Sequence, residues 1–425
     1  MNILVIGGGG REHAIIKKLK EDPRAERIFA LPGNGGIAAD AECAGVSATD
    51  VPGILAFARA NAVDFAVVAP DDPLVLGAVD VLEEAGIPCF GPRKNAAIIE
   101  GSKVFSKNLM EKYHIPTAAC RIFGAPGEAL AYVDECPLPA VVKADGLALG
   151  KGVLICETRE SAREAVRSIM EDRIFGESGA RVVIEEFLTG PEVSVLAFTD
   201  GTCVKPMVSS MDHKRALDGD RGLNTGGMGT VAPNPCYTEA VAARCMEEIF
   251  LPTIRAMNAE GRPFRGCLYF GLMLTPAGPK VIEYNCRFGD PETQVVLPLL
   301  EGSLLEIMLA VSQGRLADTP VRFRPGAACC VILASQGYPQ KYDRGFPISL
   351  PETGPDEYIY IAGASERDGQ LLTSGGRVLG AAAVASDLPG AVERAYALAD
   401  RIHFDNAFCR RDIGRRALAA MKEGK

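Results

Sequence analysis

No apolar run in the 425-residue sequence approaches the roughly 20 residues that a membrane-spanning helix needs, so we expect no membrane partner. There is no C-x-x-C pair, and the four histidines do not stand at metal-ligand spacing from the thirteen cysteines, which argues against a zinc site. Basic residues are outnumbered: 45 Lys+Arg against 54 Asp+Glu give a net charge of −9, which argues against nucleic-acid binding as the main role. The opening MNILVIGGGG is too short and too glycine-rich for a signal peptide, so we expect a cytoplasmic enzyme with reduced cysteines.

The length exceeds what one hydrophobic core usually serves, so about two to four domains are expected. Within the first hundred residues, uninterrupted apolar runs at 3–6, 28–31 and 65–69 alternate with glycine turns and helical segments. Apolar strands separated by helices are typical of a parallel sheet that is covered on both faces. We therefore predict a doubly wound α/β domain over residues 1–101, then α+β segments, and after Pro325 a β-rich region whose last helix lies near 390–402.

A glycine run, Gly7 to Gly10, follows the first predicted strand. It fails the dinucleotide fingerprint because Glu12 and His13 stand where the third glycine is required, so NAD binding is disfavoured. Backbone N–H groups at the start of the following helix would still suit a phosphate. A purely structural tight turn remains an equal alternative.

A second glycine-rich segment, DGLALGKGV, covers residues 145–153, and Lys143 precedes it. Its amides and Lys151 could cover phosphates, although Gly152 stands where a Walker loop needs Ser or Thr. An ordinary hairpin turn is the alternative interpretation.

The richest pattern is VIEYNCRFGDPET. Glu283 and Asn285 are two residues apart on a predicted strand and therefore share a face, and their oxygens suit Mg²⁺. Arg287, two residues further on, could grip a phosphate or carboxylate. A solvated edge strand would explain the same alternation without any function.

Three further segments complete the set: Glu192 after an apolar strand, where it could bind ribose hydroxyls, DHKR at 212–215, and the glycine loop NTGGMG at 224–229. Taken singly, each fits a surface loop equally well. Together the segments indicate ATP, magnesium and an anionic substrate.

The segments GGREHA, GLALGKGV, EEFL, SMDHKR, NTGGMG, EYNCRFGDPET and GGRV resemble the phosphoribosylamine–glycine ligase family of the ATP-grasp superfamily. The resemblance runs from residue 8 to about residue 413. It implies ligation of glycine to 5-phosphoribosylamine with ATP and Mg²⁺ or Mn²⁺ through glycyl phosphate, the second step of de novo purine synthesis, by a monomer. It also implies an ATP-grasp fold with a central domain at 102–121 and 189–325, a lid subdomain at 122–188 and a C-terminal domain at 326–425.

Residue roles follow from the same resemblance. The residues expected to bind the nucleotide are Lys103, Lys143, Gly146, Gly150, Lys151, Gly152, Glu185, Glu186, Phe187, Leu188 and Glu192. Those expected to bind the metal are Glu283 and Asn285. Arg287, Asp212 and Lys214 would be catalytic. The substrates would contact Gly8, Gly9, Gly10, Arg11, Asn224, Thr225, Gly226, Gly227, Met228, Gly229 and Asp290.

The sequence departs from the family pattern at three places. Ala69 and Leu149 replace a glycine and an alanine, and Gly271 stands where many ATP-grasp enzymes carry a second acidic metal ligand. Two alternatives stay open: a sister ATP-grasp ligase that uses formate or bicarbonate, and a non-catalytic nucleotide-binding regulator. The SMDHKR and NTGGMG segments argue against the first, and the presence of Glu283, Asn285 and Lys143 argues against the second.

Overall fold

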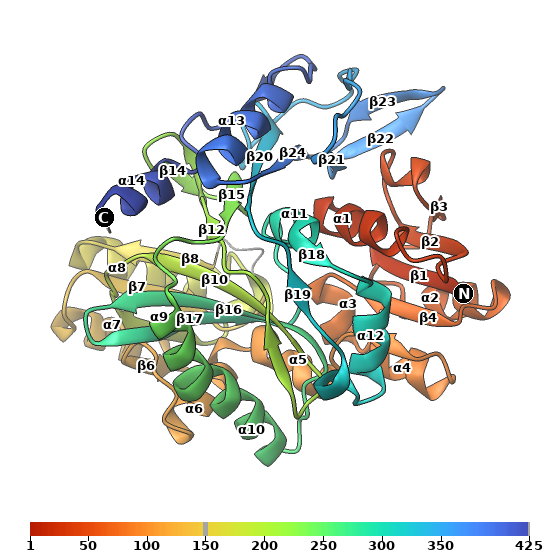
Figure 1. The fold of residues 1–425 in the computed structure, drawn as a ribbon. Helices are drawn as coiled ribbons and strands as arrows, with labels where there is room; N and C mark the ends of the chain where they lie inside the picture. Colours follow the sequence, from red (N-terminus) through yellow and green to blue (C-terminus); the bar gives the residue numbers. More distant parts are fainter. Residues whose placement is uncertain (148–151, 424–425) are drawn as a thin grey trace.

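A computed structural model describes residues 1–147 and 152–423; the predicted Gly150 and Lys151, like Leu149, lie outside the described residues. Strands and helices alternate along the first hundred residues, and antiparallel sheets dominate the rest (Figure 1). The chain therefore has the predicted mixed α/β and α+β architecture. In the described part of the chain, no helix is long and apolar enough to cross a bilayer. All thirteen cysteines, each within the described residues, are free thiols.

The N-terminal sheet is five-stranded and parallel, with the order β3-β2-β1-β4-β5. Alternation along β1 (Asn2–Gly7) explains its two covered faces: Leu4 and Ile6 enter one hydrophobic cluster, and Ile3 and Val5 enter another. The other strands are β2 (Arg27–Pro32), β3 (Glu42–Cys43), β4 (Phe65–Val68) and β5 (Cys89–Phe90); the helices are α1 (Gly10–Leu19), α2 (Val51–Ala60), α3 (Asp71–Leu76), α4 (Ala78–Glu84) and α5 (Lys94–Gly101).

A small antiparallel sheet with the order β6-β9-β7-β8 follows α6 (Lys103–Lys112). Its strands are β6 (Cys120–Phe123), β7 (Ala140–Ala144), β8 (Val153–Cys156) and β9 (Val182–Glu186), and it packs with α7 (Pro126–Glu135) and α8 (Arg159–Val166) around its own core. The next sheet has the order β11-β10-β16-β17, from β10 (Glu192–Thr199), β11 (Val204–Pro206), β16 (Gly266–Thr275) and β17 (Gly278–Asn285). Helices α9 (Glu239–Cys245) and α10 (Leu251–Ala259) accompany it.

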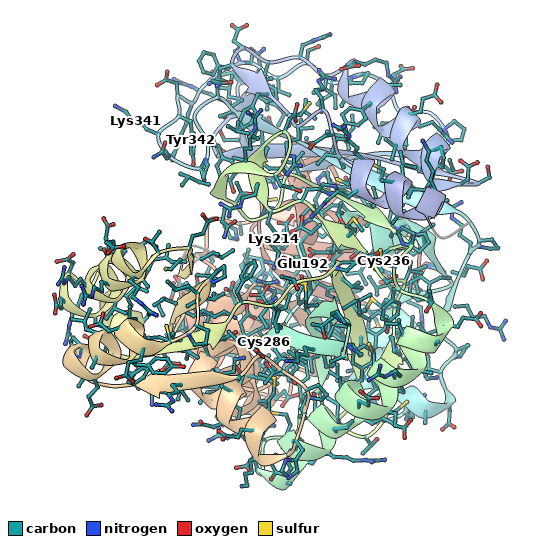
Figure 2. The ribbon with its side chains drawn as sticks, turned by 90° about the vertical axis from the view of Figure 1, so that its left-hand side faces the viewer. Glu192, Lys214, Cys236, Cys286, Lys341 and Tyr342 are labelled. Carbon is teal, nitrogen blue, oxygen red and sulfur yellow. The ribbon has the colours of Figure 1, made fainter. Side chains whose placement is uncertain are left out.

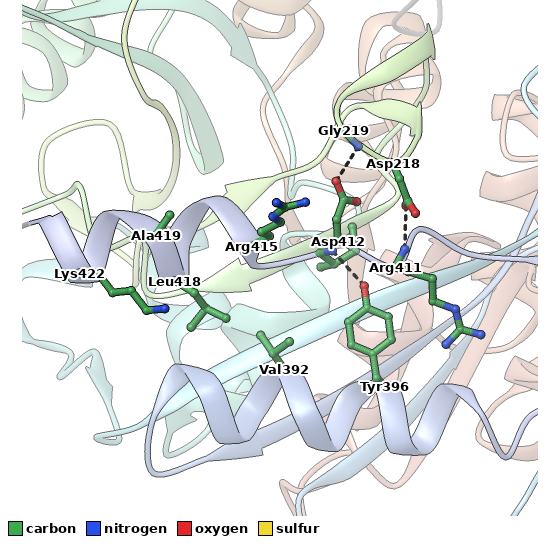
Figure 3. Close-up of a pocket in the computed structure, with 11 residues that line it drawn as sticks. Asp218, Gly219, Val392, Tyr396, Arg411, Asp412, Arg415, Leu418, Ala419 and Lys422 are labelled. Carbon is green, nitrogen blue, oxygen red and sulfur yellow. Dashed lines mark hydrogen bonds between the residues drawn. The ribbon is translucent and has the colours of Figure 1, made fainter.

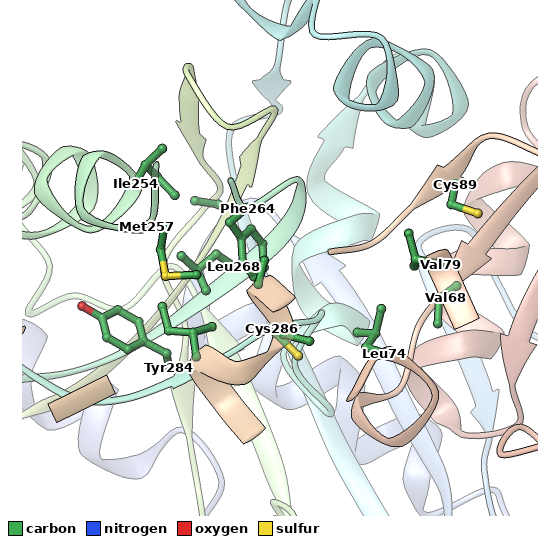
Figure 4. Packing of buried hydrophobic residues seen from close by; sticks show 14 of the residues in the cluster. Val68, Leu74, Val79, Cys89, Ile254, Met257, Phe264, Leu268, Tyr284 and Cys286 are labelled. Carbon is green, nitrogen blue, oxygen red and sulfur yellow. The ribbon is translucent and has the colours of Figure 1, made fainter. Parts of the chain in front are cut away.

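One hydrophobic cluster joins this sheet to the N-terminal domain. Phe264 and Leu268, both fully buried, lie in it together with Val68 and Val79 of the N-terminal part (Figure 4). Shared burial of this kind fixes the two parts relative to each other.

The C-terminal sheet recruits strands from the middle of the chain. Its order is β12-β15-β20-β24-β21, with β25 paired to β20; the strands are β12 (Met211–Asp212), β15 (Gly229–Ala232), β20 (Ala327–Ser335), β21 (Glu357–Ile361), β24 (Arg377–Ala385) and β25 (Ala407–Phe408). Thr230 pairs with Cys330, so the strand that follows NTGGMG belongs to the C-terminal sheet, while Ser210, just before β12, pairs with Ser194 of the central sheet.

The prediction that the last helix lies near 390–402 is wrong. α13 (Leu388–Ala399) is followed by α14 (Arg415–Glu423), in which four charged residues flank five apolar ones. The remaining short elements are β13 (Arg215–Leu217), β14 (Arg221–Asn224), α11 (Thr293–Val296), β18 (Leu300–Glu301), α12 (Leu304–Ser312), β19 (Arg322–Phe323), β22 (Ala364–Arg367) and β23 (Gln370–Thr373).

Candidate active site

A cleft of about 630 Å³ brings together most of the predicted site residues. It opens between the β6–β9 sheet and the β10–β17 sheet, and residues of the N- and C-terminal parts reach into it. The predicted residues that line it are Arg11, Lys103, Lys143, Gly152, Glu185, Glu186, Phe187, Leu188, Glu192, Asp212, Lys214, Asn224, Thr225, Gly226, Glu283, Asn285, Arg287 and Asp290.

Two lysines stand on one wall of the cleft, Lys143 buried and Lys103 half-buried. Lys103 Nζ donates to the carbonyl of Gly146 at 3.1 Å, and Lys143 Nζ donates to the carbonyl of Ile282 at 3.1 Å. Burial lowers the pKa of Lys103, and the carboxylate of Glu283 opposes that effect. Ammonium groups held away from water gain most from an anionic ligand, so this wall suits the phosphates of a nucleotide.

The opposite wall carries Glu283 and Asn285 at the end of β17. Lys214 Nζ lies 3.3 Å from Glu283 Oε1 and 3.7 Å from Glu192 Oε2, and the group lies near the middle of the molecule (Figure 2). The pKa of Glu283 is lowered to about 2, chiefly by the charge of Lys214, and the charges of Lys143 and Lys103 add to this effect. Glu283 and Glu192 in turn raise the pKa of Lys214. At neutral pH Glu283 is therefore ionised, and its carboxylate could serve as an oxygen ligand.

This donor set fits a hard divalent cation. A carboxylate and an amide at one strand end match the one or two protein oxygens that Mg²⁺ takes alongside nucleotide phosphates. Among the described residues no cluster of three or more His, Cys, Asp or Glu could hold a metal alone. Gly271 pairs with Glu283, and a Cβ at Gly271 would come within 3.0 Å of Glu283 Cγ, so a larger residue there would crowd the glutamate.

Arg287 follows the end of β17 and does not continue the strand. Its Nη2 lies 3.1 Å from Glu100 Oε1 and 3.4 Å from Asn285 Oδ1, while its buried Nε has no hydrogen-bond partner. A buried N–H group without a partner, on a charged side chain that lines the cleft, would gain from an anionic ligand.

The Gly8–Arg11 turn meets Asp290 at the far end of the cleft. Glu12 accepts a hydrogen bond from Gly9 N at 2.6 Å and another from Arg11 Nε at 2.6 Å, so the carboxylate of Glu12 takes the place where a dinucleotide fingerprint would leave room for phosphate. Arg11 Nη1 donates to the carbonyl of Phe288 at 3.1 Å. Gly8, Gly9 and Gly10 do not line the cleft themselves, although a Cβ at Gly9 would lie 3.5 Å from Asp290 Oδ2.

Asp290 and the 224–229 loop are tied together by Arg377 of β24. Arg377 Nη2 lies 3.1 Å from Asp290 Oδ2, and its Nη1 donates to the carbonyl of Gly226 at 2.8 Å. Burial would raise the pKa of Asp290, but Arg377 and Arg11 lower it on balance, so this carboxylate stays charged. The loop itself turns at Gly227, with φ +114°, where a Cβ would lie 2.7 Å from Asp212 Oδ1.

Not every predicted residue faces the cleft. Met228 is fully buried, Gly229 begins β15, and Gly146 packs against Ser178. Asp212 does line it, and burial together with Glu292 raises the pKa of its carboxyl. His213 cannot act as a general base there: it is fully buried, with Nδ1 3.1 Å from the carbonyl of Gly229 and Nε2 accepting from Gly414 N at 3.2 Å.

The cleft residues that sequence reasoning missed include Lys107, Glu100, Tyr338 and Arg377. Lys107 stands one helical turn after Lys103, and that spacing was the available signal. Arg377 belongs to the recognised GGRV segment but had no assigned role. Glu100 and Tyr338 carry no local signal, since only the fold brings them to the cleft.

A second cavity, of about 660 Å³, lies between α13, α14 and the β13–β14 turn (Figure 3). Asp412 Oδ2 accepts from Gly219 N at 2.8 Å, and Asp218 Oδ1 accepts from Arg411 N at 2.8 Å. These contacts fasten the hairpin that leads to Asn224 onto the C-terminal segment.

Comparisons with known proteins agree on one family. Three models described as the N, ATP-grasp (A) and C domains of phosphoribosylglycinamide synthetase match residues 1–100, 101–293 and 328–416. The chain is 47% identical over 424 residues to a phosphoribosylamine–glycine ligase of Vibrio vulnificus, covering 99% of each chain. A solved phosphoribosylamine–glycine ligase of Thermotoga maritima superposes with a TM-score of 0.86 at 36% identity, covering 97% of this chain and 100% of that one. The biotin carboxylase domain of the Hydrogenobacter thermophilus 2-oxoglutarate carboxylase, at 15% identity and a TM-score of 0.74, covers 96% of this chain and 91% of that one and shares the fold alone.

Proposed function

This chain belongs to the phosphoribosylamine–glycine ligase family, and from that membership we propose how its cleft works. The enzyme is an ATP-dependent carboxylate–amine ligase that joins glycine to 5-phosphoribosylamine in purine biosynthesis, giving glycinamide ribonucleotide, ADP and phosphate. The observation that carries the residue roles below is the charge arrangement of the cleft. Lysines on one wall act on an ionised Glu283 on the other, and Asp290 and two arginines lie beyond them.

Lys103 and Lys143 hold the nucleotide phosphates, because both line the cleft and their ammonium groups are half-buried or buried there. The backbone of residues 186–188 reads the adenine. The side chain of Glu186 is already engaged, with Lys280 Nζ at 2.9 Å and Ala119 N at 2.9 Å, and its N–H donates to the carbonyl of Ala119 at 2.9 Å, so neither group takes part. Glu192 binds the ribose hydroxyls.

Glu283 and Asn285 hold Mg²⁺ or Mn²⁺, which would neutralise phosphate charge during transfer. Lys214 keeps Glu283 ionised and in place. Arg287, which lines the cleft and has an unsatisfied Nε, stabilises the transferred phosphoryl group.

The glycine carboxylate attacks the γ-phosphorus of ATP and displaces ADP, giving glycyl phosphate. The amine of phosphoribosylamine then attacks the acyl carbon and expels phosphate. Asp290, the loop with Asn224, Thr225 and Gly226, and the turn ending in Arg11 position the two substrates, while Asp212 borders the same end of the cleft. Enclosure of the acyl phosphate keeps water from hydrolysing it, so most of the catalysis is positioning and charge neutralisation.

The test is ADP release from ATP and Mg²⁺ with glycine and freshly formed phosphoribosylamine added separately and together. We expect turnover only with both substrates. ADP release that ignores glycine but responds to formate or bicarbonate would instead support a sister ligase. A cytoplasmic monomer stays a prediction, which sedimentation and cell fractionation would check.

A further inference from the structure

Lys107 forms a buried charge cluster with Glu185 and Lys143. Lys107 Nζ lies 3.2 Å from Glu185 Oε1, and Lys143 Nζ lies 3.0 Å from Glu185 Oε2. The side chains of these three residues are only 3–5% exposed. One carboxylate from β9 therefore lies between a cation from α6 and a cation from β7.

The two lysines differ in how firmly they are held. Lys107 Nζ also donates to Thr117 Oγ1 at 2.8 Å and to the carbonyl of Ala118 at 3.3 Å. These two hydrogen bonds hold the ammonium beside Glu185 Oε1, which it meets as an ion pair and which has no hydrogen-bond partner. Thr117 Oγ1 donates onward to the carbonyl of Val281 at 2.7 Å, which anchors the arrangement to the central sheet. Apart from its contact with Glu185, the Lys143 ammonium donates to the carbonyl of Ile282.

This difference matters when a nucleotide binds. A Lys143 ammonium that turns to a phosphate must give up part of its contact with Glu185. A buried carboxylate without a cation is costly, so with Lys143 as its only partner Glu185 would retain that lysine or take up a proton. A second, fixed cation removes the conflict.

We propose that Lys107 is a positioning residue for nucleotide binding, which keeps the Glu185 carboxylate paired so that Lys143 is free to turn to the phosphates. The inference rests on the proposed phosphate-binding role of Lys143. It assigns Lys107 no contact with the nucleotide, and it predicts that the importance of Lys107 depends on the charge of Glu185.

The experiment measures the dissociation constant of ADP by calorimetry, and the KM values of ATP and glycine, for K107M, E185Q, the double variant and K143M. The matched control is K112M, which removes an ion-paired lysine of the same helix that is 63% exposed and bonded to Glu260. Circular dichroism and the unfolding midpoint check that each variant folds. If K107M does not fold, the double variant still tests the proposal, because it removes both charges of the buried pair.

We expect K107M to weaken ADP binding and to raise the KM of ATP by about tenfold or more, with the KM of glycine nearly unchanged. In the E185Q background, removal of Lys107 should change ADP binding by less than about threefold, because no carboxylate then needs the cation. K112M should bind ADP like the unmodified chain.

Three outcomes would contradict the proposal in different ways. Equal losses from K107M with and without Glu185 would mean that Lys107 contacts the nucleotide directly. A lower unfolding midpoint with unchanged ADP binding would mean a purely structural role. If K143M itself left ADP binding unchanged, the proposed role of Lys143 would fail, whereas a loss in K143M with none in K107M would overturn only the role of Lys107.

Discussion

Replacing Glu283 with glutamine tests the proposed metal site most directly, because the change keeps the shape of the side chain and removes its charge. The pKa of Glu283 is about 2 against an ordinary 4.5, chiefly because of Lys214. At 1.36 kcal/mol per pH unit this difference corresponds to about 3 kcal/mol of favourable interaction with the surrounding lysines. Since the side chain is 31% exposed, water screens part of it, and about 1–2 kcal/mol is a better value.

The direction in which this stabilisation changes with pH follows from the linkage between protonation and folding. The folded-state pKa lies below the unfolded one, so this stabilisation is fully present above about pH 4.5 and is lost as the pH falls toward about 2. At pH 7 E283Q should therefore unfold in urea with about 1–2 kcal/mol less free energy. Control E248Q, which breaks the exposed Arg244–Glu248 pair, should lose less than about 0.5 kcal/mol.

The functional effect should exceed the stability effect. E283Q loses the charged member of a two-ligand site, so the Mg²⁺ concentration for half-maximal ADP release should rise about tenfold to hundredfold, or about 1.4–2.8 kcal/mol. Turnover should also stay well below that of the unmodified chain at saturating Mg²⁺. Near-normal turnover with an unchanged Mg²⁺ requirement would refute the assignment of Glu283 as a ligand.

Three further predictions concern the other parts of the site and its support. R377M should lower kcat/KM for glycine and phosphoribosylamine about tenfold to hundredfold while ADP affinity stays unchanged, because it removes charged hydrogen bonds worth about 1.5–3 kcal/mol that join Asp290 to the 224–229 loop. Steady-state kinetics would show this loss, with R401M as the control variant. A loss confined to ATP would contradict the prediction. Burial lowers the pKa of His213 to about 4, below its value of 6.5 in the unfolded chain, so the free energy of unfolding should fall as the pH drops from 6.5 toward 4. Urea unfolding of H213Q should show a smaller fall over the same pH range. Equal falls in both proteins would mean that His213 is not responsible. F264A should lower the free energy of unfolding in urea by about 3–5 kcal/mol, because this fully buried ring joins the N-terminal and central parts. The control L76A, at a half-exposed position, should lower it by less than about 0.5 kcal/mol. Similar losses in both variants would contradict the role of that cluster.

The elements that the sequence predicted well are those with a local signal. β1 and the first glycine turn follow from an uninterrupted apolar run and its end, and the strand of Glu283 and Asn285 follows from alternation over a few residues. α14 was missed although its sequence RRALAAMKE is amphipathic, because nine residues are too short a window for the helical period to stand out.

The two halves of the cleft differ in the sequence distance of their contacts. The phosphate wall is built largely within one stretch: Lys103 meets Gly146, and Lys143 meets Glu185, with separations of about forty residues. The substrate end depends on Arg377, which binds Gly226 across 151 residues, and on β15, whose partner β20 lies about a hundred residues away. Spacing can suggest a pair such as Lys103 and Lys107 on one helix face, but no spacing relates Arg377 to Asp290. The distant contact also decides function, because Arg377 fixes the loop of Gly226 and the carboxylate of Asp290 at once. A change at Arg377 should therefore disturb substrate positioning even though the phosphate wall stays intact.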